Sequence, residues 1–103
     1  MAISPLNIKM TLIEFKNSLT KDLPPKDLTV YLLSLWHDGK DDWNKAHSLI
    51  DSLPGQDAAH LHAYLHRKEG DISNADYWYR RAGKQRPDIS LEEEWQNLVE
   101  SFL

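Results

Sequence analysis

Helix-breaking residues divide this chain into six segments, and each segment repeats its apolar residues with the period of an α-helix. The breaks are proline- or glycine-containing stretches, which interrupt or end helices. Among them, Gly39 and Gly70 are predicted to end the second and fourth helices. The predicted helices cover roughly residues 8–19, 26–38, 41–53, 56–69, 71–82 and 91–102. The sequence therefore predicts an all-α fold of about six helices in antiparallel hairpins.

Size and composition limit the kinds of protein that this chain can be. Its 103 residues predict a single helical domain over residues 1–103, with residues 1–9 loosely ordered. The absence of cysteine excludes disulfides and thiolate chemistry, and fits a cytoplasmic protein. The longest apolar-rich stretch, residues 30–36, is too short to span a membrane, and residues 1–9 do not resemble a signal peptide. A net charge of −4 disfavours nucleic acid as a partner, and we expect a monomer or a weak homodimer.

Two short stretches repeat each other 29 residues apart. The sequence Asp42-Trp43-Asn44-Lys45-Ala46 matches Asp71-Ile72-Ser73-Asn74-Ala75. In each, an acid can cap the helix, a large apolar residue can pack on the turn, and alanine lets two helices approach closely. We expect two similar helix–turn–helix units at these places.

The second unit resembles a tetratricopeptide repeat over residues 56–87. The residues that carry the resemblance are Ala63, Gly70, Asp71, Ala75, Tyr79, Ala82 and Pro87. The resemblance implies a tetratricopeptide-like right-handed array, with a peptide groove lined by His60, Tyr64, Arg67 and Lys68. The string HRKEGDISNADYWYRRAG is also similar to a family of small uncharacterised proteins, which implies no activity.

Short loops make consecutive helices antiparallel, so the turns of both units should lie at one end of the molecule. This placement gathers four of the five histidines with aromatic and charged residues, and leaves His60 outside. We expect this end to be a binding site for a protein, a peptide or a small anionic ligand, since guanidinium groups suit carboxylates and phosphates. The predicted binding residues are His37, Trp43, His47, His62, His66, Arg67, Glu69, Asn74, Tyr77, Trp78 and Arg81.

Two functions fit this group of residues. The first is a small helical binding module without a cofactor, in which the histidines could equally be neutral, hydrogen-bonded core residues. The alternative is a small metal- or histidine-dependent enzyme that uses His62, His66 and Glu69, because two histidines four residues apart and a carboxylate suit Zn or Fe. That spacing lacks the internal glutamate of a His-Glu-x-x-His motif, and the chain has no Gly-rich phosphate loop, so the sequence favours the binding module.

Overall fold

The computed structural model describes residues 10–103, and this part of the chain is helical without strands. The predicted all-α fold is thereby confirmed. The prediction of loose order for residues 1–9 concerns a segment outside the described residues. None of the helices between residues 10 and 103 has the length and apolarity needed to cross a bilayer. The six helices are α1 (Leu12–Ser18), α2 (Val30–Gly39), α3 (Trp43–Ile50), α4 (Gln56–Glu69), α5 (Ile72–Arg81) and α6 (Leu91–Phe102).

Side-chain caps explain where five of these helices begin. In each case an oxygen of the capping side chain accepts a hydrogen bond from the backbone N–H three residues later, which satisfies a donor that the helix leaves free. The caps of α3 and α5 were expected from the two repeated stretches of the sequence. A complete capping box at the start of α1 was not. The capping residues are Thr11, Thr29, Asp42, Asp71 and Ser90.

Two details of α2 differ from the sequence prediction. The helix begins at Val30 and not at residue 26, because Asp27 has a positive φ of 64° and Thr29 supplies the cap. Gly39 is the last residue inside α2, and the left-handed residue that follows the helix is Asp41, with φ 62°. Position 39 is also closely packed against neighbouring side chains. A Cβ there would lie 2.9 Å from Cδ2 of Leu19 and 3.2 Å from Cζ2 of Trp95.

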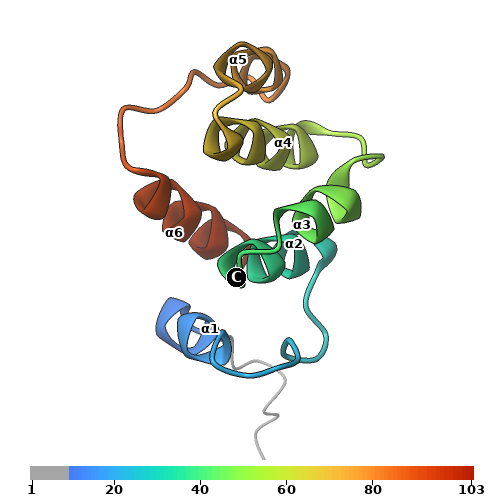
Figure 1. The fold of residues 1–103 in the computed structure, drawn as a ribbon, viewed down its shortest axis with the longest axis vertical. Coiled ribbons are helices and arrows are strands. Elements are labelled where there is room, and N and C mark those ends of the chain that lie inside the picture. Colours follow the sequence, from blue (N-terminus) through green and yellow to red (C-terminus); the bar gives the residue numbers. More distant parts are fainter. Residues whose placement is uncertain (1–9) are drawn as a thin grey trace, which may run out of the picture.

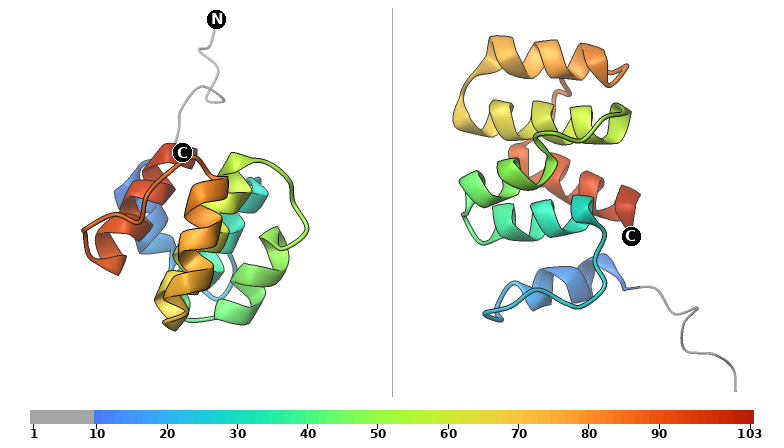
Figure 2. Two further views of the ribbon diagram at one scale, coloured as in Figure 1. Left: turned by 90° about the horizontal axis from the view of Figure 1, so that it is seen from above. Right: turned by 90° about the vertical axis from the view of Figure 1, so that its right-hand side faces the viewer.

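The first five helices lie in successive layers, and α6 lies along one side of them (Figures 1 and 2). Helices α2 and α3 form one antiparallel hairpin, and α4 and α5 form the other. After α5 the chain returns through residues 82–90, so that α6 packs against α1, α2 and α4. The indole N–H of Trp95 on α6 donates to the carbonyl of Leu35 at 3.0 Å, inside the core. The C-terminal helix therefore joins both hairpins.

The two hairpins have the same turn. The N–H of Asp42 donates to the carbonyl of His37, and the N–H of Asp71 donates to the carbonyl of His66, both at 2.9 Å. The caps Asp42 and Asp71 have nearly the same ψ angles, 75° and 77°. Each hairpin also buries completely the alanine four residues after its cap. The internal repeat seen in the sequence is thus present as a repeated local structure, while the right-handed tetratricopeptide-like arrangement stays a prediction.

Candidate histidine site between α3 and α4

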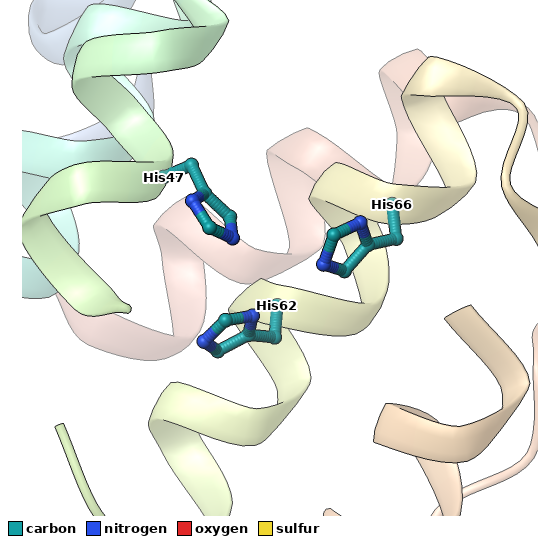
Figure 3. A group of neighbouring side chains, drawn as sticks. All are labelled: His47, His62 and His66. Carbon is teal, nitrogen blue, oxygen red and sulfur yellow. The ribbon is translucent and has the colours of Figure 1, made fainter. Parts of the chain in front are cut away.

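Three histidines from two helices meet at the interface between the hairpins (Figure 3). His47 comes from the last turns of α3, and His62 and His66 lie one turn apart on α4. One ring nitrogen of each lies within 4.8 Å of the corresponding nitrogens of the other two. His62 and His66 are buried, and His47 is half-buried. The ring centroids are 5.0 to 5.7 Å apart, so the three rings are direct neighbours.

The two histidines of α4 each have one nitrogen held by a neighbouring oxygen. Nδ1 of His66 lies 2.6 Å from Oε2 of Glu69, and Nε2 of His62 lies 3.3 Å from the backbone carbonyl oxygen of Asp51. Nδ1 of His62 is buried and has no hydrogen-bond partner. This leaves Nδ1 of His62 and Nε2 of His66 available to a ligand. An unsatisfied buried polar atom costs roughly 1–3 kcal/mol, which a ligand could recover.

Tryptophan rings enclose this group of histidines. Trp43 stacks on His47 with the ring planes 8° apart, and Trp78 stacks on His62 with the planes 10° apart. The indole N–H of Trp43 donates to the carbonyl of Leu65 at 2.7 Å, which fixes this ring against α4. The imidazoles are therefore positioned by packing as well as by hydrogen bonds, in surroundings that are mainly apolar.

The surroundings of His62 favour its neutral imidazole. Burial lowers the pKa of His62 below its ordinary value, the carbonyl of Asp51 opposes this effect, and His47 and His66 lower the pKa further. A neutral imidazole keeps a lone pair, which is the form that coordinates a metal ion. Oδ1 of Asp51 lies 3.7 Å from Nε2 of His62 and 3.8 Å from Nε2 of His47, so one exposed carboxylate is near two of the rings.

A cationic and aromatic group lies on the exposed side of Trp78. The guanidinium carbon of Arg81 is 5.3 Å from the centre of the Trp78 ring and 5.7 Å from that of Tyr77. Nη1 of Arg81 also donates to the Tyr77 hydroxyl at 3.2 Å. These two residues, together with Trp78, form an exposed rim beside the histidines.

The structure gathers most of the predicted binding residues but separates three of them. The ring of His37 packs against that of Trp36, with the ring planes nearly perpendicular and the centroids 5.2 Å apart, and has no ring contact with the other histidines in the described part of the chain. Asn74 contributes its backbone N–H to the cap of α5. Arg67 points to α6, as described below. The residues that do come together are Trp43, His47, His62, His66, Glu69, Tyr77, Trp78 and Arg81.

The face of α4 that was expected to form a peptide groove is covered by the chain itself. Arg67 pairs with Oε1 of Glu94 on α6 at 2.8 Å and also donates to the carbonyl of Ile89. The hydroxyl of Tyr64 donates to Oδ2 of Asp38 at 2.7 Å, and Nζ of Lys68 pairs with Oδ1 of the same carboxylate at 2.8 Å. His60, the histidine predicted to lie apart, also contacts α6. These four side chains contribute to internal contacts between α4 and its neighbours.

The structure changes which residues are candidates for metal ligands. The sequence suggested Glu69 as a ligand beside His62 and His66, but the Glu69 carboxylate contacts the outer nitrogen of His66. His47 supplies the third nearby nitrogen. Asp51 lies four residues after His47 in the sequence, and its position beside two of the rings depends on the fold. A second group of possible ligands, His66, Glu69 and Asp71, is more exposed and shares His66 with the first.

Comparisons with family models, with curated proteins and with solved structures give no match for this chain. The resemblance over residues 56–87 therefore remains an expectation from the sequence. The functional argument depends on the geometry of the site.

Proposed function

We propose that this chain is a small helical binding module that holds one divalent transition-metal ion through His47, His62 and His66. The observation that carries the proposal is the arrangement around His62. Its Nδ1 is buried without a partner, on a side chain that is 3% exposed, and lies in a group of three neighbouring imidazoles. Core histidines normally have their ring nitrogens satisfied. A metal ion would satisfy this atom and its two neighbours together.

The partners of the outer nitrogens support the same proposal. Metal-binding histidines usually donate their second N–H to a carboxylate or to a backbone carbonyl, which fixes the tautomer and the ring orientation. Glu69 provides such a carboxylate for His66, and Asp51 provides such a carbonyl for His62. Two of the three proposed ligands therefore already have the outer contacts that a metal site requires.

The site has to contract slightly to hold zinc. Zn–N bonds of about 2.0–2.1 Å in a tetrahedron place the ligand nitrogens about 3.3–3.4 Å apart. The three nitrogens here lie within 4.8 Å of one another, so rotations of the imidazole rings can bring them closer. The fourth position would stay open to water or to an exogenous ligand. Among common metals, three imidazoles without a thiolate suit zinc, and also copper, nickel and iron.

The metal-dependent enzyme remains a second candidate on the same residues. The open fourth position and the nearby Asp51 carboxylate are the observations that favour it, because a carboxylate beside a bound water can accept a proton. In that alternative, Glu69 orients His66 and is not itself a ligand. Both candidates depend on metal binding, so one experiment tests their common basis.

The test uses untagged protein, stripped with chelator and titrated with Zn²⁺ by calorimetry. We expect one ion per chain. Zinc at 100 times its dissociation constant should stabilise the fold by about 2.7 kcal/mol. For a domain of this size, that corresponds to a rise in Tm of about 10–20 °C. The absence of stoichiometric zinc, together with an unchanged Tm in the presence of Zn²⁺, Cu²⁺, Ni²⁺ or Fe²⁺, would contradict both candidates.

Variants separate the proposed ligands from the residues that orient them. His47→Ala removes a half-buried ligand and should abolish tight zinc binding, while the melting of the metal-free protein stays cooperative. Glu69→Ala removes the outer contact of His66 and leaves the three ligands in place, so it should weaken zinc binding by about 10- to 100-fold. His37→Ala is the control, because it deletes a histidine whose ring packs on Trp36 and lies apart from the other three, and it should leave zinc affinity unchanged. Equal zinc affinity in His47→Ala and His37→Ala would exclude His47 as a ligand.

A further inference from the structure

A cavity lies where the ends of four helices meet, and none of the three clustered histidines lines it. Its volume is about 330 Å³, at the small end of ligand pockets, so it suits a small molecule. The lining comes from the C-terminal ends of α1, α2 and α4, the turn after α2, and the first half of α6. Side chains of Leu19, Leu91 and Trp95 make one part of this lining apolar. Most of the remaining lining is charged, and these charges limit which ligand fits.

A buried carboxylate holds one cation at the wall of this cavity. Asp38 is 1% exposed, and its Oδ1 pairs with Nζ of Lys68 at 2.8 Å. Oδ2 of Asp38 accepts from the hydroxyl of Tyr64 at 2.7 Å, so both carboxylate oxygens have a partner. An ammonium group has three N–H donors, and within residues 10–103 Lys68 uses one of them, on Asp38. The Lys68 side chain is 32% exposed, so a ligand in the cavity can accept from the other donors.

Three further charged residues of the lining are exposed: Lys16 of α1, Asp41 of the turn after α2, and Glu92 of the first turn of α6. None of them forms an ion pair with another residue between 10 and 103. The cavity therefore offers two lysine ammonium groups as donors and two exposed carboxylates as acceptors. A simple anion would face the two acids, and a simple cation would face the two lysines. A molecule that carries both charges can satisfy all four groups.

Asp41 occupies a position that glycine would adopt with less strain. Its φ is 62°, and the equivalent residue of the second hairpin is Gly70, with φ 91°. Residues other than glycine cost energy in this left-handed region, and such residues are frequent at functional sites. The Asp41 side chain lines the cavity, so a contact with a ligand gives the aspartate a role that glycine could not fill.

We propose that this cavity binds a small zwitterion with an apolar side chain, of the α-amino acid class. The carboxylate of the ligand accepts from the two lysines, its ammonium group donates to the two exposed acids, and its side chain contacts the apolar part of the lining. Hydrogen bonds between charged groups are stronger than those between neutral ones. Both groups of an amino acid are ionised near neutral pH, so binding requires no change in the protonation of the protein.

The test compares L-leucine with two molecules that each lack one of its charges. Isocaproate lacks the ammonium group, and isoamylamine lacks the carboxylate. Each is titrated into ¹⁵N-labelled protein at neutral pH, and the backbone signals of residues 38–41 and 91–96 report the binding. We expect leucine to bind more tightly than either analogue by about tenfold or more, as expected for the loss of charged hydrogen bonds. Equal affinity for leucine and either analogue, or no binding of leucine at about 10 mM, would overturn the proposal.

Two variants test the contacts of the ammonium group. Asp41→Gly removes one proposed contact and should not destabilise the fold, because glycine adopts this backbone conformation without strain. It should weaken leucine binding by about two- to fivefold, the range of one exposed charge pair, and should not weaken isocaproate binding. Glu92→Gln should act in the same way. Glu93→Gln changes the adjacent acid, which does not line the cavity, and is the matched control. Native leucine affinity in both Asp41→Gly and Glu92→Gln would overturn the proposal.

The contacts of the carboxylate need a double variant, because replacing Lys68 alone would leave Asp38 buried without its cation. Asp38→Asn together with Lys68→Met removes both charges and keeps an acceptor for the Tyr64 hydroxyl. This protein should bind leucine about tenfold more weakly, or less tightly still, and should not lose affinity for isoamylamine. Lys16→Ala alters an exposed side chain and should weaken leucine binding by about two- to fivefold, while Lys26→Ala, in the loop before α2, is the control. Native leucine affinity in Lys16→Ala or in the folded double variant would overturn the proposal.

This site is separate from the proposed metal site. His47→Ala lacks a proposed zinc ligand but retains every residue of the cavity lining, so it should bind leucine with unchanged affinity. Loss of leucine binding in this folded variant would mean that leucine binds through a metal ion at the histidines, and would contradict the proposal. A protein that binds leucine but no zinc would contradict only the metal site.

Discussion

The two hairpins of this protein share a turn but not a site. His37 and His66 occupy equivalent positions, and the carbonyl of each accepts the N–H of the aspartate that caps the following helix. Twenty-nine residues separate every matched pair, and by that register Leu33 corresponds to His62. The first hairpin therefore repeats the backbone of the second without its pair of histidines on one helix face.

The two hairpins also differ in the helices and side chains that surround them. Helix α4 lies next to α3, which supplies His47, and next to α5, which supplies Trp78. At the position of Glu69, which holds His66, the first hairpin has Lys40, whose Nζ donates to two carbonyls after α1. Side chains at equivalent backbone positions thus contact different parts of the molecule. A repeated turn does not imply a repeated function.

The largest expected effect concerns the ion pair through which α6 joins the second hairpin. Glu94→Ala leaves Arg67 half-buried without its carboxylate and leaves the Tyr79 hydroxyl without an acceptor. Breaking one partner of a buried pair costs about 3–5 kcal/mol. Urea unfolding should show a loss of this size, with metal chelated. An exposed acid of the same helix, Glu100, is the control. A loss below about 1 kcal/mol, the range of an exposed ion pair, would mean that Glu94 does not join the two elements.

The same carboxylate should make stability depend on pH. The folded pKa of Glu94 is depressed, so its contribution is present above the ordinary value of 4.5 and is lost as pH falls through the folded value. Stability measured by urea unfolding should therefore decrease on acidification below about pH 4.5. Glu94→Gln removes the titrating group, and its stability should change less over this range. Parallel curves for the two proteins would assign the acid sensitivity to other groups.

The caps of the two hairpins provide a matched comparison. Asp42→Ala and Asp71→Ala should each cost about 1 kcal/mol, since each removes an acceptor at a helix N-terminus. Oδ1 of Asp42 lies 3.1 Å from the backbone nitrogen of Lys45, and Oδ1 of Asp71 lies 3.4 Å from that of Asn74, so the first substitution should cost more. Thermal melts of the metal-free variants would measure the difference. A larger cost at Asp71 would mean that cap geometry does not control the stability of these turns.

The smallest effect concerns the left-handed residue of each turn. Asp41 has φ 62°, and the equivalent Gly70 has φ 91°. Asp41→Gly should stabilise the first hairpin by a few tenths to about 1 kcal/mol, because glycine adopts this conformation without strain. Gly70→Ala should destabilise the second by about 1 kcal/mol, although a Cβ there would meet no neighbouring atom. Destabilisation by Asp41→Gly would indicate that the Asp41 side chain contributes to the turn.

Local chemistry along the chain is enough to predict the six helices, the capping aspartates and the similarity of the two turns. Caps and turns depend on residues three to five positions apart, and those relations are visible in the sequence. The gathering of His62, His66 and Glu69 follows in the same way, because all three lie on one helix face.

Packing between distant segments determined the remaining features. His47 joins the other two histidines because α3 packs against α4. His37 lies on α2, where its ring packs on Trp36. Arg67 of α4 pairs with Glu94 of α6 and lies outside the histidine group, because the C-terminal helix packs on the face of α4 where a peptide groove was expected. Gly39 leaves room for the side chains of Leu19 and Trp95, and it is not the left-handed residue that follows its helix. These contacts join residues far apart in the chain, and no local pattern specifies them, since they arise only when the helices bury their apolar faces together.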